Sequence, residues 1–165
     1  MLTAAAVQTR HRTEAHVSST NEIRKQMLIK APQSRVWRAI ADSAQFGAWF
    51  HVKLESPFVV GQPTSGQITY PGWEHVRFTL RTEAIEPETR FAYLWHPYAV
   101  DMNKDYSSEP MTRVEFLLEP QDGGTLLTVV ESGFDRLPPE RIAEALRMNE
   151  RGWAEQLDNI QAHVA

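Results

Sequence analysis

A glycine followed directly by a tryptophan, Gly152-Trp153, lies inside the last amphipathic stretch of this chain. Apolar residues recur in that stretch at the spacing of one helical face. They are Ile142, Leu146, Trp153, Leu157, Ile160 and Val164. A glycine inside a helix costs about 1 kcal/mol relative to alanine, so its position needs a packing or functional reason. We predict a long C-terminal helix that buries Trp153 and lets a curved sheet approach closely at Gly152.

The composition excludes several classes of protein. A net charge of -4 without a block of Lys and Arg argues against a nucleic-acid partner. The chain has no cysteine, which rules out disulfides, thiolate metal sites and cysteine nucleophiles and fits a reducing compartment. It has no run of about 18 apolar residues, so we expect no membrane span. The N-terminus lacks the features of a secretory signal, and we therefore expect a cytoplasmic location.

The N-terminal segment differs from the rest of the chain. Residues 1–20 are rich in Thr, Ser, Ala and Gln and show no apolar period, which predicts a flexible leader. Alternation from Ile23 to Ile29 predicts a first strand, and Ala31-Pro32 ends it. We expect residues 21–165 to form a single domain.

The segment after Pro32 predicts two short helices, then strands, then one long helix. The second short helix has Asp42 as its predicted N-cap. Turn residues separate the predicted strands, which are 51–56, 66–71, 75–84, 90–97, 111–119 and 125–132. Asp122-Gly123-Gly124 predicts a hairpin, and Leu137-Pro138-Pro139 precedes the last helix. The predicted class is α+β, with a strongly bent antiparallel sheet wrapped around the C-terminal helix.

Several short motifs resemble known proteins. Ala31-Pro32, Val36-Trp37 and the stretch 46–50 resemble the opening of the helix-grip (SRPBCC) superfamily, which includes START lipid-binding domains, Bet v-type proteins and polyketide cyclases. Other motifs resemble its branch of homologues of the activator of the heat-shock protein 90 ATPase. They are the stretches 85–87 and 90–95, Thr125 with Leu127-Thr128, Ser132-Gly133-Phe134, and Asn149 with Gly152-Trp153. The resemblance covers nearly all of the chain beyond residue 23. It implies an elongated cavity between sheet and last helix, and a binding scaffold more than a chemistry.

Inward positions of the sheet and the near face of the last helix would line such a cavity. The predicted wall and anchor residues are Trp49, His51, Trp73, His75, Phe78, Tyr93, Trp95, Phe116, Glu131, Asn149 and Trp153. The aromatic members suit an apolar or aromatic ligand, or alternatively they fill a solid core. Glu131 shares a strand face with Leu127 and Val129, and a carboxylate buried there needs pairing or protonation.

The loop between Pro97 and Pro110 is long and polar, which is typical of lids and partner surfaces as well as of plain solvated connections. Its Tyr98 and Tyr106 are candidates to gate a cavity mouth. The six histidines show no i,i+4 pairing on a helix, and no catalytic or cofactor motif is present, so we expect no cofactor and no metal.

Three hypotheses about function remain open at this point. The first is a protein that binds a small molecule or a lipid-like ligand without catalysis. The second is a co-chaperone-like interaction module, which predicts a solid interior and an exposed apolar or acidic contact patch instead of a cavity. The third is a polyketide-cyclase-type enzyme, which predicts a titratable pair within hydrogen-bond reach inside the pocket, with Glu131 and a histidine as the first candidates. The pattern leaves the oligomeric state open.

Overall fold

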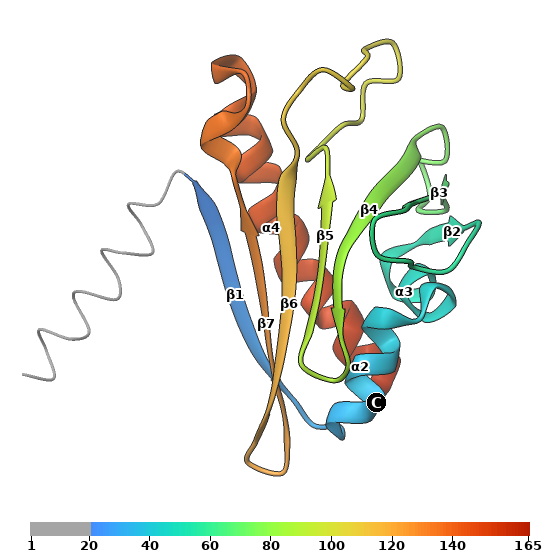
Figure 1. Ribbon diagram of the computed structural model, residues 1–165, viewed down its shortest axis with the longest axis vertical. Helices are drawn as coiled ribbons and strands as arrows, with labels where there is room; N and C mark the ends of the chain where they lie inside the picture. Colours follow the sequence, from blue (N-terminus) through green and yellow to red (C-terminus); the bar gives the residue numbers. More distant parts are fainter. Residues whose placement is uncertain (1–20) are drawn as a thin grey trace, which may run out of the picture.

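The computed structural model describes residues 21–165 (Figure 1). The predicted leader, residues 1–20, lies outside the described residues. In chain order the elements are β1 (Glu22–Ile29), α2 (Gln33–Ala41), α3 (Ser43–Phe50), β2 (Val52–Leu54), β3 (Pro63–Ile68), β4 (Arg77–Glu86), β5 (Arg90–Trp95), β6 (Thr112–Gln121), β7 (Gly124–Ser132), the 3-10 turn η1 (Phe134–Arg136) and α4 (Pro139–Val164). The predicted α+β helix-grip architecture is confirmed.

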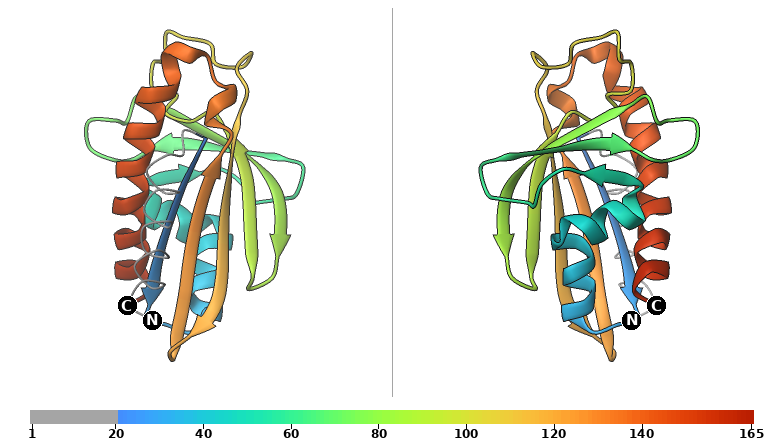
Figure 2. Two further views of the ribbon diagram at one scale, coloured as in Figure 1. Left: turned by 90° about the vertical axis from the view of Figure 1, so that its left-hand side faces the viewer. Right: turned by 90° about the vertical axis from the view of Figure 1, so that its right-hand side faces the viewer.

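The seven strands form one antiparallel sheet in the order β1-β7-β6-β5-β4-β3-β2. Helix α4 runs along one face of this curled sheet (Figures 1 and 2). Helices α2 and α3 contact α4, and they also contact the sheet, α2 at β6 and β7 and α3 at β2. Phe116 pairs with Val129 and Val114 pairs with Glu131 in the β6–β7 register, so these four side chains share one face. All four are fully buried, which places that face towards the core beneath α4.

Local signals predicted the turns and helix ends well. Asp122 and Gly123 both have positive φ, 50° and 77°, as a two-residue type I′ hairpin requires. The Asp42 side chain accepts a hydrogen bond from the Gln45 N–H at 3.0 Å and so caps α3. Helix α4 begins at Pro139, where the missing N–H leaves no hydrogen bond unmade.

Strand boundaries near β2 and β3 differ from the prediction. Strand β3 begins at Pro63 instead of residue 66, and β2 has only three residues, Val52–Leu54. The β3 sequence PTSGQI contains few β-branched or aromatic residues, so its alternation gives little signal. A proline is tolerated there because it is the first residue of the strand.

The core between α3 and the sheet is aromatic. The Phe46 ring lies at its centre and has its centroid 4.6 Å from that of Trp49, 5.2 Å from that of Phe50 and 5.4 Å from that of Phe58. Tyr93 meets Phe46 edge-on at 6.2 Å. The Phe46–Phe50 pair is stacked and the other pairs are tilted or edge-on, and aromatic quadrupoles favour edge-on and offset-stacked arrangements.

The expectation that Gly152 permits a close approach of the sheet is wrong. A Cβ built at Gly152 would meet no heavy atom within 4 Å. Close backbone approaches occur at three other glycines, Gly47, Gly66 and Gly124. A Cβ on Gly47 in α3 would run into the carbonyl of Val52, and one on Gly66 into the backbone of Lys53. Helix α3 therefore depends on a glycine for its contact with β2.

Within residues 21–165, no helix combines the length and apolar character needed to cross a membrane.

Replacing Gly47 by alanine tests the close contact between α3 and the Val52 carbonyl of β2. Alanine favours helix, but its Cβ would overlap the Val52 carbonyl, and such backbone overlap costs about 1–3 kcal/mol. We expect Gly47→Ala to lower the free energy of unfolding, measured by urea denaturation. An unchanged or raised free energy of unfolding would show that α3 does not pack closely against β2 at this point.

Candidate functional site

The carboxylate of Glu131 on β7 is fully buried and accepts four hydrogen bonds. Its Oε1 accepts from Asn149 Nδ2 at 3.0 Å and from Trp153 Nε1 at 2.8 Å, both on α4. Its Oε2 accepts from Trp95 Nε1 on β5 at 2.7 Å and from Thr112 Oγ1 on β6 at 2.6 Å. One side chain thus joins three neighbouring strands to the long helix. We call this the Glu131 network.

None of the four partners carries a positive charge. Burial therefore raises the pKa of Glu131, although the hydrogen bonds from Thr112, Trp95, Trp153 and Asn149 lower it in part. The two indole N–H groups can only donate, so each needs an acceptor in the core. The prediction that Glu131 points inward is confirmed by its burial.

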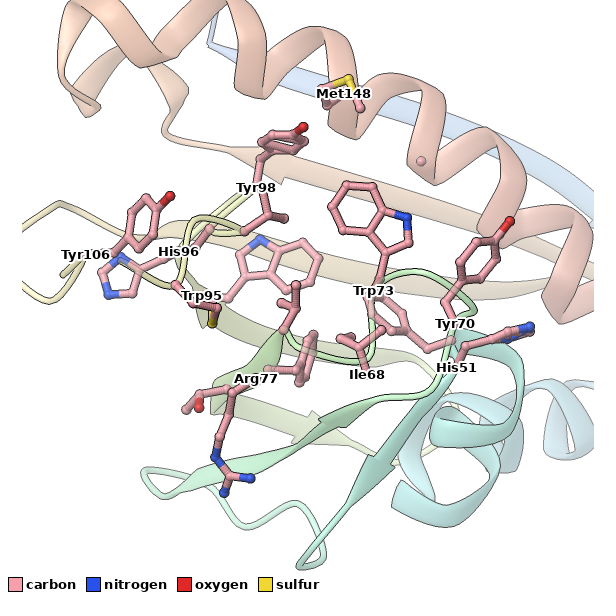
Figure 3. Close-up of a pocket in the computed structure, with 18 of the residues that line it drawn as sticks. His51, Ile68, Tyr70, Trp73, Arg77, Trp95, His96, Tyr98, Tyr106 and Met148 are labelled. Carbon is pink, nitrogen blue, oxygen red and sulfur yellow. The ribbon is translucent and has the colours of Figure 1, made fainter. Parts of the chain in front are cut away.

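A pocket of about 560 Å³ lies beside this network. It is bounded by α4, by the ends of β3, β4 and β5, by the C-terminus of α3 and by the loop after β5 (Figure 3). Its apolar lining residues are Phe50, Ile68, Tyr70, Trp73, Val76, Phe78, Trp95, Tyr98, Ala99, Val100, Met102, Tyr106 and Met148. Its polar lining residues are His51, Arg77, Thr79, His96, Ser107, Glu155, Gln156 and Asn159. Gly152 completes the wall on α4.

Aromatic rings surround the pocket. Trp73 and Tyr70 come from the turn between β3 and β4, and their rings point towards α4 (Figure 3). Trp95 lies between these rings and the loop that carries Tyr98. The Arg77 side chain points away from the cavity and pairs with Glu55. The centre of the pocket is therefore apolar, and its charged groups lie at the margin.

The long loop after β5 is tied to the first turn of α4. Arg141 donates to the carbonyl oxygens of Pro97 at 2.8 Å and Tyr98 at 3.2 Å, and it pairs with Glu109 at 3.0 Å. Its guanidinium also lies 4.8 Å from the centre of the Tyr106 ring, a cation–π distance. The loop between Pro97 and Pro110 is thus held against the first turn of α4 and forms one wall of the pocket.

His96, also in the pocket wall, has a buried Nδ1 without a hydrogen-bond partner among the described residues. Burial lowers the pKa of His96, an effect that the charges of Glu109 and Asp105 oppose and that of Arg141 reinforces. Tyr98 and His51 have positive φ, 48° and 66°. Such backbone is costly for residues other than glycine and is found more often at functional sites.

The structure brings together only some of the predicted site residues. His51, Trp73, Phe78 and Trp95 line the pocket. Trp49, Tyr93 and Phe116 are buried in the aromatic core instead. His75 is exposed beside Trp73, outside the lining. Glu131, Asn149 and Trp153 form the Glu131 network behind the wall.

These differences have a physical cause. Strand alternation shows that Tyr93 and Phe116 face inward, but α3 packs onto the middle of that face and fills it with Phe46 and Trp49. The pocket lies beyond the C-terminus of α3, between α4 and the ends of β3–β5. The Tyr93 hydroxyl is left without a partner among the described residues, and burial followed by the Glu131 charge raises its pKa well above the ordinary value.

The lining residues that the prediction missed include several on α4, in the turn before β4 and in the loop after β5. Met148, Gly152, Gln156 and Asn159 recur at helical spacing, one position ahead of the buried stripe that includes Trp153. The helical spacing of this second stripe is visible in the sequence. Its members are partly apolar and partly polar, however, so the sequence gave no reason to predict that they line a cavity. Tyr70 lies in the turn around Pro71-Gly72, where no alternation indicates a direction.

Within residues 21–165, His, Asp and Glu side chains form no group of three that could hold a metal ion. Glu131 has no histidine among its hydrogen-bond partners in that part of the chain; the Glu131–histidine pair expected for a cyclase-type enzyme is absent there.

Comparison with known proteins places this architecture. Residues 30–165 match the family described as Activator of Hsp90 ATPase homolog 1-like protein. The chain belongs to this family. No curated protein matches it in sequence.

Solved structures share the fold of this Activator of Hsp90 ATPase homolog 1-like chain. A protein from Arthrobacter aurescens aligns with a TM-score of 0.71 at 19% identity, over 88% of this chain and 86% of that one. The Aha1 dimer from Colwellia psychrerythraea gives 0.64 at 15% identity, over 87% and 95%. DynU16 from the dynemicin biosynthetic locus gives 0.66 at 22% identity, and the aligned region covers 87% of this chain but only 47% of DynU16. At these identities the likeness shows the fold alone.

Replacing Glu131 by glutamine tests the network. An amide oxygen can accept from one pair of donors, but the amide nitrogen then faces the other pair. Each pair contains one indole N–H, of Trp95 or of Trp153, which cannot reverse its role. We expect Glu131→Gln to lower the free energy of unfolding at pH 7 by about 1–3 kcal/mol in urea denaturation. A neutral outcome would mean that the four donors are satisfied without the carboxylate.

The wild type and Glu131→Gln should also differ in how their stability depends on pH. The folded-state pKa of Glu131 is raised above its ordinary value of 4.5, so the folded state keeps the proton to higher pH than the unfolded state does. The stability of the wild type relative to Glu131→Gln should therefore be largest below the unfolded-state pKa. It should fall as the pH rises through the folded-state pKa. Urea unfolding of both proteins between about pH 4 and pH 8 measures this difference; an increase with pH would contradict the assigned direction.

Proposed function

We propose that this protein binds an apolar small molecule in the pocket between α4, the ends of β3–β5 and the loop after β5. A volume of about 560 Å³ lies within the range of about 300–1,000 Å³ typical of ligand sites. Apolar and aromatic residues outnumber the eight polar residues of the lining, and a mainly apolar wall is usual in such sites.

The exposure of the aromatic wall carries this proposal. Tyr70 and Trp73 leave 52% and 40% of their surface accessible, and Met102 on the opposite loop leaves 44%. Large apolar side chains in this arrangement remain in contact with water, which is unfavourable by about 25 cal/mol per Å². A ligand that fills the pocket would cover all three at once.

The co-chaperone alternative fits the described surface less well. It predicts a solidly packed interior and an exposed apolar or acidic contact patch instead of a cavity. Outside the pocket, the large exposed apolar residues of the described chain are Leu28, Val59 and Val60. Leu28 lies on β1, while Val59 and Val60 lie between β2 and β3, at the opposite edge of the sheet. They form no common patch.

Native mass spectrometry of the purified protein, with solvent extraction of what it carries, tests the proposal directly. Binding predicts a co-purifying apolar molecule at a stoichiometric ratio, or a raised melting temperature with members of a lipid and aromatic-metabolite panel. A ligand-free mass without any shift across the panel would overturn it and favour the interaction module.

A substitution at Trp73 tests the pocket itself. The neutral fluorophore N-phenyl-1-naphthylamine serves as probe, because its emission rises in apolar surroundings. Trp73→Ala removes one exposed ring of the wall and should weaken probe binding roughly two- to tenfold. Since Trp73 is partly exposed, we expect a stability loss of less than about 1 kcal/mol. Val60→Ala, at an exposed site outside the pocket, is the control and should leave the affinity unchanged. Equal affinity of the wild type and Trp73→Ala would place the probe elsewhere.

A further inference from the structure

Gly152 occupies a position in α4 where the fold itself does not require a glycine. Its φ is not positive, and a Cβ built there would meet no heavy atom within 4 Å. Neither backbone conformation nor packing therefore explains the residue. A glycine in a helix interior destabilises the helix relative to alanine. This contrasts with Gly47 in α3, where the Val52 carbonyl leaves no room for a Cβ atom.

The open space at Gly152 belongs to the pocket. Met148 and Gln156 lie one helical turn before and after it, and all three line the cavity. A side chain at position 152 would project between them into the cavity. Because Gly152 has no side chain, helix backbone forms that part of the wall. This surface is flatter than it would be with a side chain at position 152.

Flat surfaces also form the opposite wall. The rings of Trp73 and Tyr70 point towards α4 from the turn before β4 (Figure 3). Both rings are about half exposed, which leaves part of each ring open to a partner. A planar group between the helix backbone at Gly152 and these rings would gain stacking contacts that a flexible chain cannot make as fully.

The charges around the pocket favour a ligand without net charge. Apart from the histidines, the charged side chains in its lining are Arg77 and Glu155. Arg77 points out of the cavity and is paired with Glu55, and Glu155 is exposed. Neither provides a buried counter-charge, and the centre of the cavity is apolar. An ionic ligand would lose its hydration there without compensation.

We propose that Gly152 determines the specificity of the pocket, which takes a neutral, planar, ring-containing molecule with one ring placed between the α4 backbone at Gly152 and the rings of Trp73 and Tyr70. This inference rests on the proposed function. It explains why the chain keeps a glycine that weakens its longest helix.

Three variants test the assignment with N-phenyl-1-naphthylamine as the probe, which offers a planar naphthalene ring. Gly152→Leu fills the gap and should weaken probe binding roughly tenfold or more, the effect of blocking part of an apolar site. Gly152→Ala should weaken it less. Gly152→Ala should also raise the melting temperature by about 2–4 °C, because the helix gains propensity without a clash. Ala154→Leu, at an exposed position of α4 outside the lining, is the matched control and should bind like the wild type.

Competition in the wild type tests the shape of the ligand. The planar 2-naphthol should displace the probe at lower concentration than the straight-chain 1-decanol. Full probe affinity in Gly152→Leu, a lowered melting temperature in Gly152→Ala, or better competition by 1-decanol would each overturn the inference while leaving a ligand-binding pocket in place. A wild type that binds neither the probe nor any member of the ligand panel would instead overturn the proposed function, and the ligand assignment with it.

Discussion

The four hydrogen bonds to the Glu131 carboxylate are the interaction on which the placement of α4 against the sheet depends. A buried carboxylate is tolerated only when its oxygens are well satisfied, so the donors from β5, β6 and α4 must all be in position together. Two of them are the indoles of Trp95 and Trp153, whose rings lie 5.7 Å apart. By orienting Trp95, the network also shapes the back wall of the pocket.

Three separate features of the structure keep the pocket open: the end of the aromatic core, the position of the loop after β5, and the glycine in α4. The aromatic core around Phe46 ends before it, so the sheet face there is not filled. Arg141 holds the loop after β5 near the first turn of α4 through the carbonyls of Pro97 and Tyr98. At Gly152 the helix contributes no side chain. The fold thus keeps a volume open that close packing would otherwise close, and it accepts exposed rings and a helix glycine as the cost.

Much of the fold could be predicted because its signals are local. Alternation places Phe116 with Val114 on one face of β6, and Val129 with Glu131 on one face of β7, because side chains alternate in any strand. The Asp122-Gly123 turn, the Asp42 cap and the proline at the start of α4 act within a few residues, so their sequence signature suffices. The same alternation correctly indicated that Glu131 is buried, but not which groups satisfy it.

The site could be predicted only in part, because its composition depends on contacts between distant segments. The sequence by itself determined the class of fold, the inward face of each clear strand and the need for partners at Glu131. Only the tertiary structure decided that Tyr93 and Phe116 lie in the solid core, and that His51, Trp73 and Trp95 meet at the cavity. It also decided that Gly152 faces open space. Periodicity shows which face is turned inward, whereas sheet curvature and the position of α3 decide which part of that face is filled.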